Sequence, residues 1–446
     1  MEAEAKTGRD RFTSRAGFIM ACVGSAVGMA NIWLFPYRTA ELGGAAFLIP
    51  YFVFVALLGF TGVIGEMAFG RAMGTGAMGA FAKALEMRGV KHGRVIGKLV
   101  GAIPTLGSLA IAIGYAVVLG WAFRYLVFAL TGQLMVSGDV AALFGGVAAD
   151  FGNVGYHLLG LAVTFFVMLF GISRGIERLN KVLMPLFFVL FLIVLARVAT
   201  LPGAGGGYEY LFVPRWEALA DPKTWVYALG QAFFSLSLAG SGTLVYGSYL
   251  GRDVDVVTSA RNVALFDTLA AIVAAAVVVP AVFAFGLDVS SGPPLMFITL
   301  PGVFQQMPLG GVFAVVFFVA VVFAAVTSLV NLFEAPVEAL QEQLRLPRWA
   351  AVGVIAAVAV AVGLFIEGGD AVSAWMDAIS IYVIPVGALL AAIMFFWVCP
   401  KGFARAQAEE GHGKRLGGWF EFMTRYVFVG ITAAVIVLGI FFGGIG

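Results

Sequence analysis

The chain has 446 residues, of which 61% are hydrophobic and only 12% are charged, about half the charged fraction of a soluble domain. Apolar stretches of about 20 residues recur from one end to the other, and that length crosses a bilayer as a helix. The composition excludes a soluble protein. It also excludes a β-barrel, whose strands would show as short alternating segments, and it predicts an all-α integral membrane protein.

Eleven membrane helices are expected, after a polar cytoplasmic segment formed by residues 1–14. In chain order the expected helices span 15–38, 43–70, 96–130, 156–172, 178–198, 225–250, 259–286, 309–344, 349–366, 371–398 and 420–444. A shorter helix is expected in a loop at 297–307, between Pro294 and Pro308. The two cysteines and three histidines show no disulfide or metal-ligand spacing.

The positive charges indicate how the chain is oriented. With the N-terminus in the cytoplasm, all but five of the 27 Lys and Arg residues fall on the cytoplasmic side, in agreement with the positive-inside rule. An odd number of helices then places the C-terminus outside.

Two of the expected helices contain clusters of weak helix formers. Helix 1 carries them at 24–31 and helix 6 at 235–242, where Gly and Ser allow the backbone to unwind. The clusters lie five helices apart, which predicts an inverted repeat of 15–198 and 225–398 followed by an eleventh helix. Paired breaks of this kind mark the central site of a transporter. The competing interpretation is close helix packing through small residues.

An unwound helix exposes carbonyl oxygens that can bind sodium and amide N–H groups that can bind a carboxylate. Side-chain oxygens near the breaks could complete a sodium shell. The candidate oxygen donors are the carbonyls of Gly24, Ala26 and Val27, the amide of Asn31, Ser235, and the adjacent pair Thr327 and Ser328. Hydroxyls in membrane helices also bond back to their own backbone, which is the alternative for the last pair.

Ionisable residues inside apolar helices are costly and therefore candidates for function. Four are expected there: Glu66, Asp267, Glu334 and Asp377. Asp267, one helix after the second break, could balance the charge of sodium, or it could form an interhelical hydrogen bond. The chain has no phosphate-binding loop of the GxxxxGK[ST] type, no ladder of arginines and no repeated filter loop, which argues against an ATP-driven pump, a voltage sensor and a channel.

The segment Gly24–Tyr37, read as GSAVGMANIWLFPY, resembles the helix 1 signature of the neurotransmitter:sodium symporter family. Further similar segments are GGAAFLIPY at 43–51, GEMAFGR at 65–71, RGIER at 174–178 and GQAFFSLS at 230–237. The resemblance implies the LeuT-type fold of five plus five helices with unwound helices 1 and 6. Eleven helices resemble the bacterial branch, which implies a transporter of the bacterial inner membrane.

The resemblance also implies two sodium ions. The first would be bound by Ala26, Asn31, Ser235 and the carboxylate of the substrate, with Asp267 from helix 7 completing the shell. The second would be bound by Gly24, Val27, Ala324, Thr327 and Ser328. Contact between the carboxylate and sodium would couple the two affinities, which is the thermodynamic basis of symport.

For the substrate, the resemblance implies that its carboxylate meets the amides near Met29 and Ala30 and the hydroxyl of Tyr115, under a lid formed by Phe234. The full set of substrate-binding residues expected is Ala26, Met29, Ala30, Ile111, Tyr115, Phe234, Ser235, Ser237, Ala239, Gly240, Ser241, Ser328 and Leu332. Relatives with a bulky residue at the place of Gly240 have less room, so a large apolar or aromatic side chain is expected here. No acidic residue faces this pocket, which argues against cationic substrates.

Chloride-dependent relatives place an anion beside Tyr51, Gln231 and Ser235, and chloride-independent relatives place a carboxylate there. Asp267 resembles that carboxylate, so no chloride requirement is expected. Counting back from Pro280 places either Asp267 or Phe266 at the family's position.

Gating residues are implied on both sides. Arg9 would pair with Glu342 near Tyr249 at the cytoplasmic side, and Gly175 and Pro185 either permit unwinding of helix 5 or mark an ordinary helix start and kink. The family's outer gate pairs an Arg in helix 1 with an Asp in helix 10. Here Leu34 replaces the Arg while Asp377 is present, so the outer gate must differ.

The sequence therefore predicts a sodium-coupled importer of neutral, large hydrophobic or aromatic L-amino acids. A proton-coupled carrier of the same fold, using Glu66 or Asp267, is the first alternative, and a non-transporting membrane sensor is the second. Nothing in the pattern indicates enzyme chemistry or nucleic-acid binding. A monomer suffices for the mechanism, and the sequence does not indicate an oligomeric state.

Overall fold

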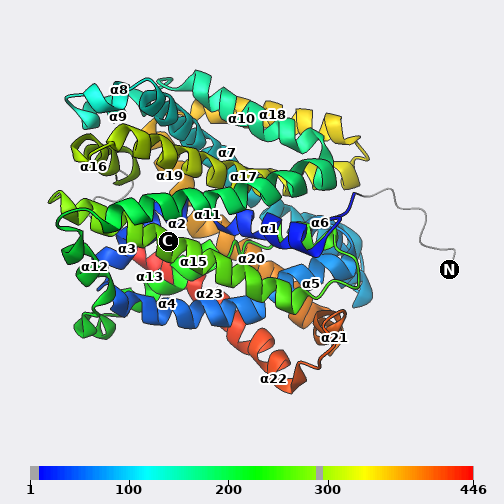
Figure 1. Cartoon of the computed structure of the whole chain (residues 1–446). Helices are drawn as coiled ribbons and strands as arrows, with labels where there is room; N and C mark the ends of the chain where they lie inside the picture. Colours follow the sequence, from blue (N-terminus) through cyan, green and yellow to red (C-terminus); the bar gives the residue numbers. More distant parts are fainter. Residues whose placement is uncertain (1–9, 288–294, 445–446) are drawn as a thin grey trace.

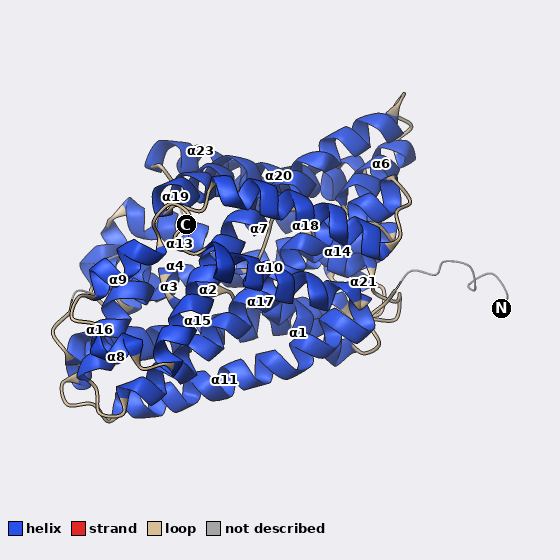
Figure 2. Cartoon of the chain, turned by 90° about the horizontal axis from the view of Figure 1, so that it is seen from above, coloured by secondary structure: helices blue, strands red, loops and turns tan. Residues whose placement is uncertain are grey.

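The computed structural model describes residues 10–287 and 295–444, which form helices joined by loops without any strand in those two ranges. The helices run roughly parallel to one another (Figure 1). One end of the bundle, here called the N-terminal end, contains the start of α1 together with α6 (Ala77–Met87) and α21 (Phe403–Glu409). The opposite end contains short helices, which lie there in Figure 2 as well: α8 (Gln133–Val136), α9 (Val140–Val147) and α16 (Leu300–Gln306), with α12 (Ala204–Phe212) beside them in Figure 1.

Eight helices in the described ranges are long and apolar enough to span a membrane, and a bent pair at the start of the chain makes a ninth. The eight are Ala45–Met73 (α4, Ala45–Leu58, to α5, Ile64–Met73), α7 (Gly93–Leu130), Ile172–Ala199 (ending in α11, Glu177–Ala199), α15 (Val256–Ala284), α17 (Gly310–Gln343), α18 (Arg348–Phe365), Gly369–Val398 (α19, Gly369–Ala378, and α20, Ile384–Ile393) and Gly417–Phe442 (α22, Gly417–Phe422, and α23, Val429–Phe442). The other two predicted helices are α10 (Val154–Leu169), which is short, and predicted helix 6, which is split.

Both predicted breaks are confirmed. Helix 1 consists of α1 (Arg15–Ala26), α2 (Met29–Ile32) and α3 (Leu34–Glu41), and its two halves meet at 64°. Helix 6 consists of α13 (Pro222–Ser235) and α14 (Gly242–Ser248). Between them Ser237 and Gly240 have φ of 54° and 68°, a left-handed conformation that ends a helix.

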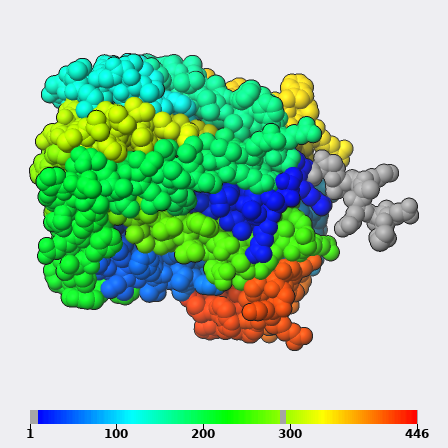
Figure 3. Space-filling model, viewed as in Figure 1, coloured from blue at the N-terminus to red at the C-terminus, as the bar shows by residue number. Residues whose placement is uncertain are grey.

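Burial separates the helices that build the centre from those that face lipid. About two thirds of the most apolar window of α7 and of α17 is buried, against 28% for Ile172–Ala199 and 22% for Gly417–Phe442. On α11, which crosses the face seen in Figure 3, apolar side chains such as Val182, Leu186 and Val189 are exposed. An exposed apolar helix face is stable in contact with lipid tails and unfavourable in water.

Candidate functional site

Two adjoining cavities lie where the broken helices meet. The inner cavity has a volume of about 80 Å³ and the outer one about 370 Å³. Ala30, Tyr115, Phe234 and Ile384 line both, so these side chains form the boundary between the two spaces. The outer cavity extends from there past Leu34 to Asp377, toward the end of the bundle opposite residue 10.

Most residues predicted to bind substrate converge on the inner cavity. Its lining includes Ala26, Ala30, Ile111, Tyr115, Phe234, Ser235, Ser237, Ala239, Ser241, Ser328 and Leu332. Met29 lines the outer cavity instead. Phe234 lies at the boundary, the position expected of a lid.

Gly240 is the one residue of the predicted substrate-binding set that lines neither cavity, because it faces helix 10. Its N–H donates to Glu66 Oε1 at 2.8 Å. A Cβ added at Gly240 would lie 2.3 Å from the carbonyl oxygen of Gly387. The glycine is required by its positive φ and by this close backbone approach, so the expectation that its small size widens the pocket is corrected.

Tyr115 holds the unwound backbone of helix 1 in place. The N–H of Met29 donates to the Tyr115 hydroxyl at 2.8 Å. A hydroxyl that accepts one hydrogen bond keeps its own hydrogen to donate. The site can therefore offer an O–H donor beside the amides at the start of α2, which suits a carboxylate.

A second polar cluster joins helices 1, 6 and 7. The Asn31 amide nitrogen donates to Asp267 Oδ1 at 2.8 Å, and the Ser235 hydroxyl donates to Asp267 Oδ2 at 2.6 Å. All three side chains are buried. Phe266 turns the other way and contacts the ring of Phe188, so the register of α15 places Asp267, not Phe266, in this cluster.

A third cluster joins helices 1 and 8. The Ser328 hydroxyl lies 3.0 Å from the Gly24 carbonyl oxygen and 3.3 Å from that of Val27. Thr327 bonds back to the carbonyls of Phe323 and Ala324, both at 3.0 Å. The structure thus brings together the oxygens of Gly24, Val27, Ala324, Thr327 and Ser328, although the threonine hydroxyl also makes the backbone bond named as its alternative.

Residues 9–139 and 137–442 match the family described as the sodium:neurotransmitter symporter family. The chain belongs to this family. It is 36% identical over 327 residues to an uncharacterized sodium-dependent transporter of Bacillus subtilis, YhdH, covering 73% of this chain and 71% of the relative. It is 30% identical over 459 residues to an uncharacterized sodium-dependent transporter of Methanocaldococcus jannaschii, MJ1319, covering 96% and 90%.

The crystal structure of MhsT in complex with L-phenylalanine matches this structure with a TM-score of 0.85 at 31% identity, covering 97% of this chain and all of that one. The LeuT-type fold and the resemblance on which it was predicted are confirmed. The protein is a sodium-dependent transporter of the sodium:neurotransmitter symporter family, whose members are not enzymes.

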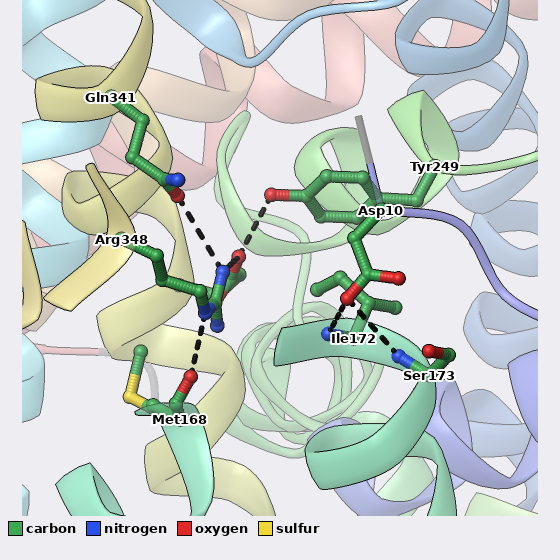
Figure 4. Close-up of polar contacts among 8 residues, drawn as sticks. Asp10, Met168, Ile172, Ser173, Tyr249, Gln341 and Arg348 are labelled. Carbon is green, nitrogen blue, oxygen red and sulfur yellow. Dashed lines mark hydrogen bonds and ion pairs between the residues drawn. The ribbon is translucent and has the colours of Figure 1, made fainter. Parts of the chain in front are cut away.

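A buried ion pair that was not predicted from the sequence lies at the N-terminal end of the bundle. Arg348 Nη2 lies 2.7 Å from Glu334 Oε2, and the Tyr249 hydroxyl donates to Glu334 Oε1 at 2.8 Å (Figure 4). Arg348 also donates to the carbonyl of Met168, and Asp10 accepts from the N–H groups of Ile172 and Ser173. The available signal was Glu334, since a carboxylate deep in an apolar helix requires a cation.

Two of the predicted cytoplasmic gate residues make hydrogen bonds within the described ranges. Glu342 accepts one from Thr75, and Tyr249 donates one to Glu334. Arg9 lies outside the described residues. On the other side Asp377 is exposed and lines the outer cavity together with Leu34.

Replacing Tyr115 by phenylalanine should weaken substrate binding about tenfold or more while leaving the fold intact. The change removes one hydroxyl that supports the Met29 N–H and that can donate to a bound carboxylate, and hydrogen bonds to charged groups contribute about 1.5–3 kcal/mol. Equilibrium binding of a labelled amino acid to the purified protein measures the effect. Unchanged affinity would contradict a role for Tyr115 in binding the carboxylate.

Proposed function

We propose that this protein is a sodium-coupled symporter that carries neutral, large hydrophobic or aromatic L-amino acids into the cell. The observation that carries the proposal is the hydroxyl of Tyr115, which holds the Met29 N–H beside a cavity and next to two clusters of buried oxygens. A carboxylate bound there would lie close to sodium. Each ligand would then raise the affinity of the other, and neither would cross efficiently alone.

Two sodium ions are proposed, one for each cluster. The first takes Ala26, Asn31, Ser235 and Asp267 with the substrate carboxylate, and the second takes Gly24, Val27, Ala324, Thr327 and Ser328. The first set contains an anionic carboxylate, whereas the second consists of neutral oxygens only. Both suit sodium, a hard cation that prefers oxygen donors.

The neutral substrate class is supported by the inner cavity, whose described lining contains no Asp, Glu, Lys or Arg. Ile111, Leu332 and Ile384 supply an apolar wall. The preference for a large side chain is supported by the related MhsT, which was crystallised with L-phenylalanine.

No chloride requirement is proposed, because the Asp267 carboxylate supplies a fixed negative charge beside Ser235. We also propose a bacterial inner-membrane location, with the N-terminal end in the cytoplasm and the outer cavity facing outside. Transport would then be an alternating movement of the two repeats, 15–198 and 225–398.

A proton-coupled carrier is the second candidate, and Glu66 favours it. Its side chain is buried, Oε1 accepts the Gly240 N–H, and Oε2 has no hydrogen-bond partner in the described ranges. A protonated carboxyl at this position could carry a proton between states.

Uptake into proteoliposomes separates the candidates. Labelled L-amino acids are tested with an inward sodium gradient, and again with choline in place of sodium. Uptake of Phe, Trp, Tyr or Leu only with sodium is expected. Uptake driven equally well by a proton gradient without sodium would replace the proposal with the proton-coupled candidate.

A further inference from the structure

Asn180, in the first turns of α11, has a buried amide oxygen without a described hydrogen-bond partner. The side chain is fully buried, and its Nδ2 donates to the carbonyl of Ile176 at 2.8 Å. Its Oδ1 makes no hydrogen bond in the described ranges. Buried polar atoms without partners are uncommon, so each one requires an explanation such as a bound water or ion.

The unpaired oxygen points at helix 1. A Cβ added to Gly24 would lie 1.9 Å from Asn180 Oδ1 and 3.0 Å from Thr327 Cβ, so all three residues meet at one point. The absence of a side chain at Gly24 is what allows the carboxamide to come so close. The orientation of the amide follows from chemistry, because flipping it would set its oxygen against the carbonyl oxygen of Ile176.

We propose that Asn180 binds the second sodium ion through Oδ1. This assignment rests on the proposed function. It adds a sixth oxygen, from helix 5, to the five oxygens of helices 1 and 8, and the ion would bridge three helices. All six donors are neutral, so every added oxygen counts in replacing the hydration shell of the ion.

The assignment links sodium binding to the N-terminal end of helix 5. The Nδ2 of Asn180 donates to the carbonyl of Ile176, which is the last residue of a π-helical turn, Ile172–Ile176. Three residues of the N-terminal segment hold this region through hydrogen bonds to the backbone of 172–173 and to Glu177: Asp10, Thr13 and Ser14. Release of that segment and loosening of the turn would withdraw Oδ1 from the ion and favour its release toward the same end.

Thermal unfolding of the purified full-length protein tests the assignment without transport. The midpoint is measured in increasing NaCl, with choline chloride holding ionic strength constant and without amino acid. Wild type should gain stability with sodium, since a ligand that binds only the folded state stabilises it. Asn180→Leu should raise the half-maximal sodium concentration roughly tenfold, and Asn180→Asp, which keeps the oxygen and adds charge, should lower it.

Asn153→Leu is the matched control, because Asn153 is also a buried asparagine but lies at the start of α10, away from this cluster. It should leave the half-maximal sodium concentration unchanged. If Asn180→Leu does not fold, Asn180→Ala carries the same expectation. An unchanged sodium dependence in the folded Asn180 variant, beside a sodium-responsive wild type, would overturn the assignment alone. A wild type that neither binds sodium nor shows sodium-driven uptake would overturn the proposed function and the assignment with it.

Discussion

Replacing Asp267 by serine is expected to make transport depend on chloride. The fully buried carboxylate bonds to Asn31 and Ser235 and provides the fixed negative charge at the first proposed sodium site. Two unit charges 4 Å apart interact by about 4 kcal/mol at an effective dielectric constant of 20, which corresponds to several hundredfold in affinity. Without chloride, uptake by Asp267→Ser should therefore fall at least about a hundredfold.

Chloride should rescue this variant because anion donors are already in place. The Tyr51 hydroxyl lies close to Ser235 and Asp267. That hydroxyl and both polar atoms of the Gln231 amide are buried without hydrogen-bond partners in the ranges described. Gln231 lies one helical turn before Ser235 on α13, so the two face the same space. Removing the carboxylate leaves room and donors for one anion.

The measurement is sodium-driven uptake in chloride and in gluconate. Asp267→Asn is the matched control: it removes the charge but keeps the volume, so it should lose uptake to a similar extent and gain much less from chloride. Uptake by Asp267→Ser that remains at the wild-type level in gluconate would show that the carboxylate does not replace an anion.

The sequence predicted the path of the chain and the two breaks because these depend on local composition. Apolar length specifies the spans, and Gly and Ser clusters specify where helices 1 and 6 unwind. The short helices α6, α9, α12 and α21 were not predicted, since none of them has the apolar length that identifies a membrane span.

Side-chain orientation was the part that local pattern could not provide. The sequence suggested that Gly240 lines the pocket, but its backbone has a positive φ and packs closely against Gly387. Asp267 and Phe266 were indistinguishable by counting, and only the packing of α15 against helices 1 and 6 separates them. Asn180 and Arg348 lie next to helices that are distant in the sequence, so the residues around them in the chain did not identify them as functional candidates.

Replacing Arg348 by methionine is expected to open the N-terminal end of the bundle. The change would leave Glu334, which is fully buried, without its cation, and breaking a buried pair by removing one partner costs about 3–5 kcal/mol. A state in which water reaches Glu334 avoids that cost. The equilibrium should therefore shift by tenfold or more toward conformations in which Tyr249 and the neighbouring ring of Phe12 have separated from the core.

Cys22 provides a native reporter for this opening. The thiol is buried in α1, and the only other cysteine, Cys399, is buried as well. In a Cys399→Ser background, labelling of Cys22 by a maleimide should be slow in the parent and about tenfold faster or more in Arg348→Met. Equal rates would contradict a closing role for the ion pair.

The double variant Glu334→Leu/Arg348→Met distinguishes the effect of the unpaired buried charge from the effect of losing the hydrogen bonds of Arg348. A buried ion pair replaced as a whole by apolar groups of similar volume is often neutral for stability, because no charge is left unpaired. If the single variant opens the bundle through the buried charge, the double variant should label as slowly as the parent. If Arg348 instead acts through its bond to the Met168 carbonyl, which ties helix 9 to helix 4, the double variant should label as fast as the single one.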